Sequence, residues 1–238
     1  MVRVLRTIPV ALIVVACGKD SSGPAAGFEC LGQPLPTTAP ASITVSGTTK
    51  SNVLMPMALA GVEVIVSRTG TDTLGVDTSS APGRFSISVA TGGTPVDGQL
   101  QLKKSGYLPT YAYPSRPMAA NDSTNVLMLT SSELTGLSVA AGITLQAGKG
   151  LIGVIVEDCS GNTLAGATIS SNPPGTVRYN AGGLPSQTAN ATAADGVAYI
   201  ANVTAGNVTI MATASGHTLR QHVVNARADA ITLTSIQP

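Results

Sequence analysis

Aromatic and charged side chains are both scarce in this 238-residue sequence. Phe, Tyr and Trp make up 3% of it, with no Trp, and Asp, Glu, Lys and Arg make up 11%, against about a quarter in an average domain. The formal net charge is only +1, which excludes the excess of cations that nucleic-acid binding needs. The apolar residues are mainly Val, Ile, Leu and Ala. With 26 Gly and 15 Pro, this composition favours short strands over helices.

Familiar catalytic and phosphate-binding motifs are also absent: there is no G-x-S-x-G, H-E-x-x-H, C-x-x-C or phosphate-binding Gly loop. The two histidines, His217 and His222, lie five residues apart, so on one strand they would point to opposite faces and share no metal. Acids occur singly near expected turns, without the spacing of a calcium loop, at Asp72, Asp77, Asp158, Asp195 and Asp229. We predict no metal, no cofactor and no enzymatic activity. The alternative is a periplasmic hydrolase whose site is assembled from residues far apart in sequence.

The sequence has no hydrophobic run long enough to span a bilayer, which takes roughly 20 residues. Its longest apolar run near the start, residues 8–16, follows Arg3 and Arg6 and ends at Cys17. A charged start, a short apolar core and small residues before a cleavage point predict a secretory signal over residues 1–16. An ordinary cleaved signal and a short membrane anchor are the alternatives.

The stretch "VVAC" (14–17) resembles the lipobox of bacterial lipoproteins. The resemblance implies cleavage before Cys17, diacylation (palmitate-type) of its sulfur and acylation of its new amino group. Two or more acyl chains give stable anchoring to a membrane. Residues 17–40 would then form a flexible tether. By analogy with enterobacterial sorting, Gly18 in place of Asp favours the outer membrane, facing the periplasm or the cell surface.

Two cysteines remain if Cys17 is acylated, and in an exported protein an even remainder suggests one disulfide. We expect a bridge between Cys30, in "FECLGQPLP", and Cys159, in the turn "EDCSGN". It would tie the N-terminal segment to the second half of the chain. Two separate free thiols, or pairing between molecules, are the alternatives.

An internal repeat divides the rest of the sequence. "LAGVEVIVS" (59–67) matches "LAGATISSN" (164–172), and three further blocks follow in the same order with offsets between 104 and 114 residues. Two homologous modules, 41–130 and 149–238, are therefore expected. Between them lies a linker, 131–148, in which "TSSELTGLSVAAGI" (130–143) predicts a short helix capped by Ser131 or Ser132 and ended by Gly142.

Apolar residues alternate with polar ones within each module, as in "FSISVA" and "VAYIANV", which is typical of half-buried strands. Gly61 and Gly166 supply permissive backbone for a turn before a strand. The pieces "ALAGVEVIVS", "APGRFSISV" and "KKSGYLPTY", with their second-module counterparts, resemble carboxypeptidase regulatory-like domains. The resemblance covers most of the chain and implies two tandem seven-stranded, transthyretin-like antiparallel β-sandwiches. The His-x-x-Glu zinc ligands of metallocarboxypeptidases are absent, so no peptidase activity is implied.

One cluster of aromatic residues stands out in "GYLPTYAYP". Tyr107, Tyr111 and Tyr113 lie at even separations, so on a single strand all three would share a face. Such a face could bind a sugar ring or a peptide, or it could simply cover the sandwich or the neighbouring module. We expect a lipid-anchored, non-catalytic binding or structural/adhesion module of the cell envelope. Its partners would be the membrane, another envelope protein or a glycan.

Overall fold

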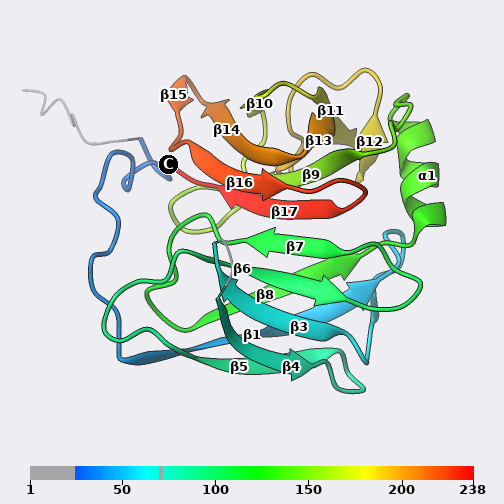
Figure 1. Cartoon of the computed structure of the whole chain (residues 1–238). Helices are drawn as coiled ribbons and strands as arrows, with labels where there is room; N and C mark the ends of the chain where they lie inside the picture. Colours follow the sequence, from blue (N-terminus) through cyan, green and yellow to red (C-terminus); the bar gives the residue numbers. More distant parts are fainter. Residues whose placement is uncertain (1–24, 70–71) are drawn as a thin grey trace, which may run out of the picture.

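The computed structural model describes residues 25–69 and 72–238, and this part of the chain is almost entirely β. It contains seventeen strands, β1 to β17, and one short helix, α1 (Figure 1). The strands form three sheets, two of four strands and one of nine. The first half of the fold is formed by β1 to β8 and the second half by β9 to β17.

Each half has one small sheet of its own. The small sheet of the first half consists of β2 (Met57–Ala58), β1 (Ser42–Ser51), β5 (Arg84–Ala90) and β8 (Asp122–Met128). That of the second half consists of β10 (Thr168–Asn172), β14 (Gly206–Ala214), β15 (His217–Thr218) and β16 (His222–Ala226).

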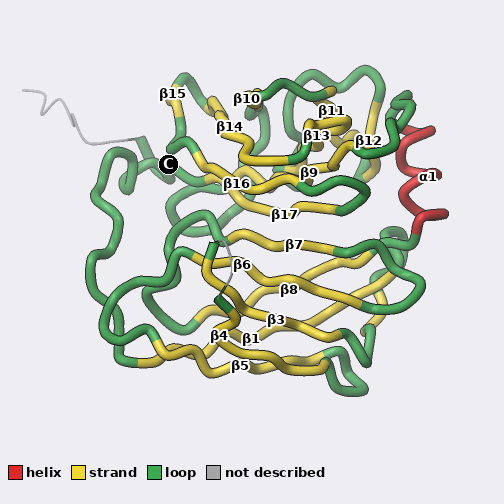
Figure 2. Tube along the Cα trace, in the orientation of Figure 1, coloured by secondary structure: helices red, strands yellow, loops and turns green. Residues whose placement is uncertain are grey.

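The nine-stranded sheet runs through both halves. In spatial order it consists of β12 (Leu184–Ser186), β11 (Thr176–Ala181), β13 (Val197–Thr204), β9 (Lys149–Val156), β17 (Ile231–Ile236), β7 (Thr110–Tyr113), β6 (Gly98–Lys103), β3 (Glu63–Arg68) and β4 (Thr73–Thr78). The halves meet where β7 pairs with β17 in parallel, from Thr110 opposite Ile231 to Tyr113 opposite Thr234. Figure 2 shows β7 and β17 side by side in the middle of the molecule.

Several strands pair in the same way in the two halves. In the first half, β1 pairs antiparallel with β5 and parallel with β8. In the second half, β9 pairs antiparallel with β13 and parallel with β17. Thr49 and Val156 occupy equivalent positions: each donates its N–H to a glycine carbonyl, Gly83 or Gly196, and each carbonyl accepts from a leucine N–H.

The halves differ in one strand. β4 forms a hairpin with β3 at the edge of the nine-stranded sheet, whereas β11 pairs with β13 on the other side of its sandwich. β4 and β11 follow the equivalent strands β3 and β10. β4 joins the sheet of β3, whereas β11 joins the sheet that packs against β10.

Two hydrophobic clusters lie between the packed sheets. In the first half, side chains of β1, β5 and β8 meet those of β3 and β6; in the second half, those of β9, β13 and β17 meet those of β10, β14 and β16. β5 alternates strictly between exposed and buried residues, as its sequence predicts. The all-β class and the sandwich packing are confirmed. The shared nine-stranded sheet is a feature that the prediction of two tandem sandwiches does not contain.

The predicted glycine turns and the predicted linker helix are both present in the structure. Gly61 and Gly166 adopt positive φ angles of 69° and 76°, which favour glycine. The linker helix α1 spans Ser131–Ala140. Its N-cap is Thr130, in a capping box with Glu133, rather than the predicted Ser131 or Ser132. The correction has a simple reason: only Thr130 lies three residues before Glu133, the spacing that a capping box needs.

Gly47, in the middle of β1, allows β8 to approach closely. A Cβ at this position would lie 1.9 Å from the carbonyl oxygen of Thr124 and 2.9 Å from Cζ of Phe85. We predict that Gly47→Ala lowers the free energy of unfolding by about 2 kcal/mol or more, because backbone and core must both shift. Urea unfolding followed by circular dichroism measures this.

Gly136→Ala is the matched control. Gly136 is exposed within α1, and a Cβ there would meet no atom within 4 Å. Alanine should therefore be neutral or stabilise by up to about 1 kcal/mol. Equal stability of Gly47→Ala and the wild type would contradict the close approach.

Candidate functional site

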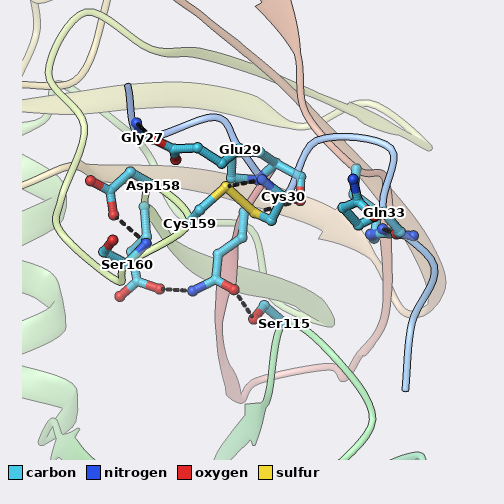
Figure 3. The surroundings of a disulfide bond; sticks show 12 residues. Gly27, Glu29, Cys30, Gln33, Ser115, Asp158, Cys159 and Ser160 are labelled. Carbon is cyan, nitrogen blue, oxygen red and sulfur yellow. Dashed lines mark hydrogen bonds between the residues drawn. A yellow bond between two sulfur atoms is a disulfide. The ribbon is translucent and has the colours of Figure 1, made fainter. Parts of the chain in front are cut away.

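The N-terminal segment of the described chain is fastened to the second half of the molecule (Figure 3). Cys30 and Cys159, 129 residues apart in sequence, form the predicted disulfide, with an S–S distance of 2.07 Å. The backbone N–H of Cys30 also points at Sγ of Cys159, 2.9 Å away. The chain thus contains the expected bridge rather than two free thiols. We call this region the disulfide junction, comprising Phe28, Cys30, Gln33, Arg116, Cys159, His217, Arg220 and Pro238.

Asp158 fixes the turn that carries Cys159. Its carboxylate accepts hydrogen bonds from the backbone N–H groups of Ser160 and Asn162, each at 2.8 Å, and from the Asn162 side-chain amide at 2.9 Å. These bonds, the Asn162 side chain first, lower the pKa of Asp158. The Cys159 N–H in turn donates to the carbonyl of Gly27 at 2.9 Å. The acid predicted near a turn therefore has a structural role here.

Phe28 inserts into the hydrophobic core of the second half. Its side chain is only 3% exposed, and its ring lies 4.6 Å from that of His217, measured between centroids. Burying a whole aromatic side chain contributes on the order of 2–3 kcal/mol. The N-terminal segment is thus held by apolar packing as well as by the disulfide.

The junction also contacts the C-terminus and the first half. Arg116 donates from Nη2 toward Sγ of Cys30 at 3.3 Å, and that sulfur lies 3.6 Å from the carbonyl oxygen of Pro238. Arg220 donates to the carbonyl of Gln33. The segment that precedes β1 is therefore fixed from three directions.

Gln237 connects the two halves beside the disulfide. Its side-chain carbonyl oxygen accepts from the Ser115 hydroxyl at 3.2 Å, and its side-chain amide nitrogen donates to the Glu157 carboxylate at 3.1 Å (Figure 3). Burial raises the pKa of Glu157, and the bond from Gln237 partly offsets this.

A second contact between the halves centres on Arg227. Its guanidinium carbon lies 3.7 Å above the centre of the Tyr111 ring. The same group donates to the Tyr113 hydroxyl at 3.0 Å, the Asn225 carbonyl at 3.1 Å and the Gln99 side-chain oxygen at 3.2 Å. A planar cation with this many partners restrains rotation of one half against the other.

The three tyrosines predicted as a ligand face do not form one open surface. Tyr113 is 5% exposed in the core of the second half, Tyr111 lies under Arg227, and Tyr107 lies in a loop against the first core. The physical reason is that β7 begins only at Thr110, and the face that carries Tyr111 and Tyr113 is covered by Arg227 and by Asn225 of β16. Glycan binding here stays a prediction without support from this geometry.

The histidines and the surface depressions offer little for catalysis. His217 lies on β15 and His222 on β16, and no group of three or more His, Cys, Asp or Glu in the described residues could hold a metal. Two shallow depressions of about 430 Å³ each are lined by neither histidine nor cysteine. In the second, the Asp77 carboxylate already accepts from the N–H groups of Thr78 and Ser86.

Sequence reasoning missed Phe28, Arg116 and Arg227. Phe28 is one of only two phenylalanines and lies two residues from Cys30, a signal that could have assigned it to the core. The two arginines belong to no periodic pattern in the sequence. Arg116 contacts Cys30, 86 residues away, and Arg227 contacts Tyr113, 114 residues away.

Cys17, predicted as the lipidation site, lies outside the described residues, as does the whole signal segment 1–16. The single helix of the described chain, with ten residues, is too short to cross a membrane.

Removing the disulfide should loosen the junction. We predict that Cys30→Ala combined with Cys159→Ala lowers the free energy of unfolding by about 2–5 kcal/mol, because the cross-link restrains a long loop of the unfolded chain. Urea denaturation measures the loss, and limited proteolysis should show earlier cleavage within residues 25–35. Ser160→Ala, in the same turn, should change stability by less than about 0.5 kcal/mol. Unaltered unfolding and cleavage in the double variant would contradict this role.

His222 should make stability depend on pH. Its Nε2 is buried without a hydrogen-bond partner among the described residues, and burial, opposed by Asp97, lowers its pKa below the ordinary 6.5. The unfolded chain then binds the proton more readily, so stability is present above pH 6.5 and is lost as the pH falls toward the lower folded-state pKa. We predict a lower urea midpoint at pH 5.5 than at 7.5, and a smaller difference for His222→Gln. The same difference in both proteins would count against this assignment.

The sequence matches no protein-family model and none of the curated proteins. Among solved structures, the chain resembles the Bacillus anthracis TIE protein with 14% identity and a TM-score of 0.25, over 83% of this chain and 34% of that one. The shaft pilin SpaA from Lactobacillus rhamnosus GG aligns with 11% identity and a TM-score of 0.26, over 83% of this chain and 98% of the pilin.

BcpA, the major pilin subunit of Bacillus cereus, aligns with 9% identity and a TM-score of 0.29, over 82% of this chain and 99% of that one. The chain spans about a third of the TIE protein's length but nearly all of each pilin. At these TM-scores the alignments support no conclusion about the fold or the function of this chain.

Proposed function

We propose that this chain is a lipid-anchored, non-catalytic protein of the cell envelope, acting as a binding or structural/adhesion module. Cys17 would carry the lipid, and the described residues would form the body held at the membrane surface. The body would comprise two carboxypeptidase regulatory-like modules, residues 41–130 and 149–238, joined by the linker 131–148.

The disulfide is the observation that carries the proposal. Disulfides such as Cys30–Cys159 form and persist in oxidising compartments outside the cytosol, as an exported protein requires. Cys30 also lies only 13 residues after Cys17. The bridge would therefore connect the lipid-bearing N-terminal segment covalently to the second half.

Part of the predicted flexible tether, 17–40, is fixed, because Phe28, Cys30 and Gln33 are bound at the disulfide junction. The length of chain before the junction would then set how far the body can move from the membrane. Seven residues, 18–24, separate Cys17 from the described chain. Fully extended, they span at most about 25 Å. The disulfide junction would thus stay close to the lipid surface. The second half would lie nearer the anchor than it would if the N-terminal segment were attached to the body only through β1.

The two modules would act as one rigid body. Three contacts support this: the parallel pairing of β7 with β17, the Arg227 guanidinium against Tyr111, and the Ser115–Gln237–Glu157 hydrogen bonds. A stiff spacer or adhesion module needs such coupling, whereas an enzyme needs converging acids, bases and nucleophiles. The two depressions described above contain Glu63 and Asp77 but neither histidine nor cysteine among their lining residues. The partner on this reading is another envelope protein.

Acylation is tested by metabolic labelling. Cells expressing the full chain should incorporate labelled palmitate into the protein, and Cys17→Ser should abolish the label and release the body from the membrane fraction. The Cys30→Ala, Cys159→Ala double variant is the control, and it should keep the label. Label retained in Cys17→Ser, or wild-type protein recovered from the cytoplasm, would refute the proposal.

A further inference from the structure

The loop between β1 and β2, together with the first residue of β2, exposes a cluster of large apolar side chains. Leu54, Met55 and Met57 are 73%, 70% and 62% exposed, and they fall within four consecutive residues. The remaining strongly exposed apolar residues of the described chain are dispersed singly over other elements. We call residues 54–57, which include Pro56, the apolar tip. A protein surface normally leaves such side chains exposed singly, so their concentration in one loop indicates a contact site.

The apolar tip is held in shape by hydrogen bonds at its base. Asn52 adopts a positive φ of 67°, and its side-chain oxygen accepts from the N–H groups of Leu54 at 3.1 Å and Met55 at 3.2 Å. Below it, β1 pairs with β2 from Lys50 opposite Ala58 to Ser51 opposite Met57. These bonds fix the turn in which Leu54, Met55 and Met57 are exposed.

Cations surround the base of the apolar tip. Lys50 lies opposite Ala58, and Arg84 lies opposite Thr48 on the neighbouring strand. Nζ of Lys104 lies 3.2 Å from where a Cβ on Gly61 would be. Residues 44–62 contain no acid.

Three acids lie nearby. The Asp77 carboxylate lines the same depression as Arg84 and accepts from the backbone N–H groups of Thr78 and Ser86. Glu63 is opposite Lys103 in the sheet, and the Glu133 carboxylate is taken up by the backbone N–H and hydroxyl of Thr130. Four cations, Lys50, Arg84, Lys103 and Lys104, therefore lie near these three acids, which leaves a small positive balance of charge.

The apolar tip and the N-terminal segment lie at opposite ends of the molecule. The tip follows Ser51, which pairs with Met128 three residues before α1 begins. The N-terminal segment is bound beside Pro238. Figure 1 shows α1 and the C-terminus at opposite sides. A contact through the tip is thus separate from the proposed anchor at Cys17.

We propose that the apolar tip docks on a lipid membrane with anionic headgroups. Leu54, Met55 and Met57 enter the boundary between headgroups and acyl chains, and Lys50, Arg84 and Lys104 contact the headgroups. Apolar insertion and basic attraction together are what interfacial membrane binding requires.

A lipid surface fits these features better than a second copy of the chain. Two copies meeting tip to tip would bring Lys50, Arg84 and Lys104 toward the same cations of the partner, which costs free energy. A bilayer accepts unbranched methionine side chains without a complementary pocket, and anionic lipids match the surrounding charge. The contact goes beyond the proposed function and does not need Cys17 to be acylated.

A tryptophan at the tip tests the proposal, since the chain contains none. The full-length Leu54→Trp protein is mixed with vesicles of phosphatidylcholine and phosphatidylglycerol, and with vesicles whose acyl chains are brominated. We expect a blue-shifted emission and quenching by the brominated chains. Val223→Trp, on β16 at a site 53% exposed, is the matched control and should show neither change.

Charge reversal tests the headgroup contact. Lys50→Glu with Lys104→Glu in the Leu54→Trp protein should weaken binding to the anionic vesicles about tenfold or more. Circular dichroism checks that these exposed or half-exposed positions leave the fold intact. The same measurements on a Cys17→Ser background separate the tip from the anchor, because quenching at position 54 should persist there.

Three results would overturn the proposal. One is water-exposed emission and no quenching of Trp at position 54 with vesicles present. Another is equal quenching at positions 54 and 223. The third is a blue shift that depends on protein concentration but not on lipid, which would assign the tip to contact with a second copy.

Discussion

The parallel pairing of β7 with β17 is the interaction on which the rest of the architecture depends. It joins two half-sheets into one of nine strands, and the cores are exchanged across it: Tyr113 of β7 is buried in the second core, and Leu233 of β17 packs against the first. Arg227 then reinforces this seam, since one guanidinium contacts β6, β7 and the end of β16. Because the seam is made of backbone hydrogen bonds as well as side chains, the halves cannot separate without leaving donors and acceptors unpaired.

The disulfide junction makes a second connection along a different path. Chain order alone would attach the N-terminal segment to the first half, because β1 follows it. Cys30 and Phe28 instead bind it to the second half, beside the end of β17. The first half is thereby held from two directions, through the segment 34–41 that leads into β1 and through the β7–β17 seam. Any load applied near the N-terminus would reach the second half first, without passing through the first.

The sequence allowed the local features of the fold to be predicted better than the long-range ones. Period-two alternation predicted β5, the glycines at 61 and 166 predicted turns, and the cysteine count predicted the bridge. These signals come from neighbouring residues or from the number of cysteines in the chain. The β7–β17 seam was not predicted, because parallel pairing between strands 121 residues apart leaves no periodic signal in either strand. The tyrosines illustrate the consequence. Tyr111 and Tyr113 share a strand, but Arg227 and Asn225 of the second half cover the surface that they would have formed.

The two halves differ at the outer edge of one pair of equivalent strands, β8 and β17. Register equates Val126 of β8 with Ile236 of β17, because each lies opposite the equivalent residue, Thr49 or Val156. The outer edge of β17 is covered by β7, whereas β8 pairs only with β1 among the described strands. β8 accordingly carries exposed polar residues where β17 is largely buried: Asp122, Ser123 and Asn125. A charged, polar edge disfavours the addition of another strand. The same position in the repeat is therefore adapted for pairing in one half and against pairing in the other.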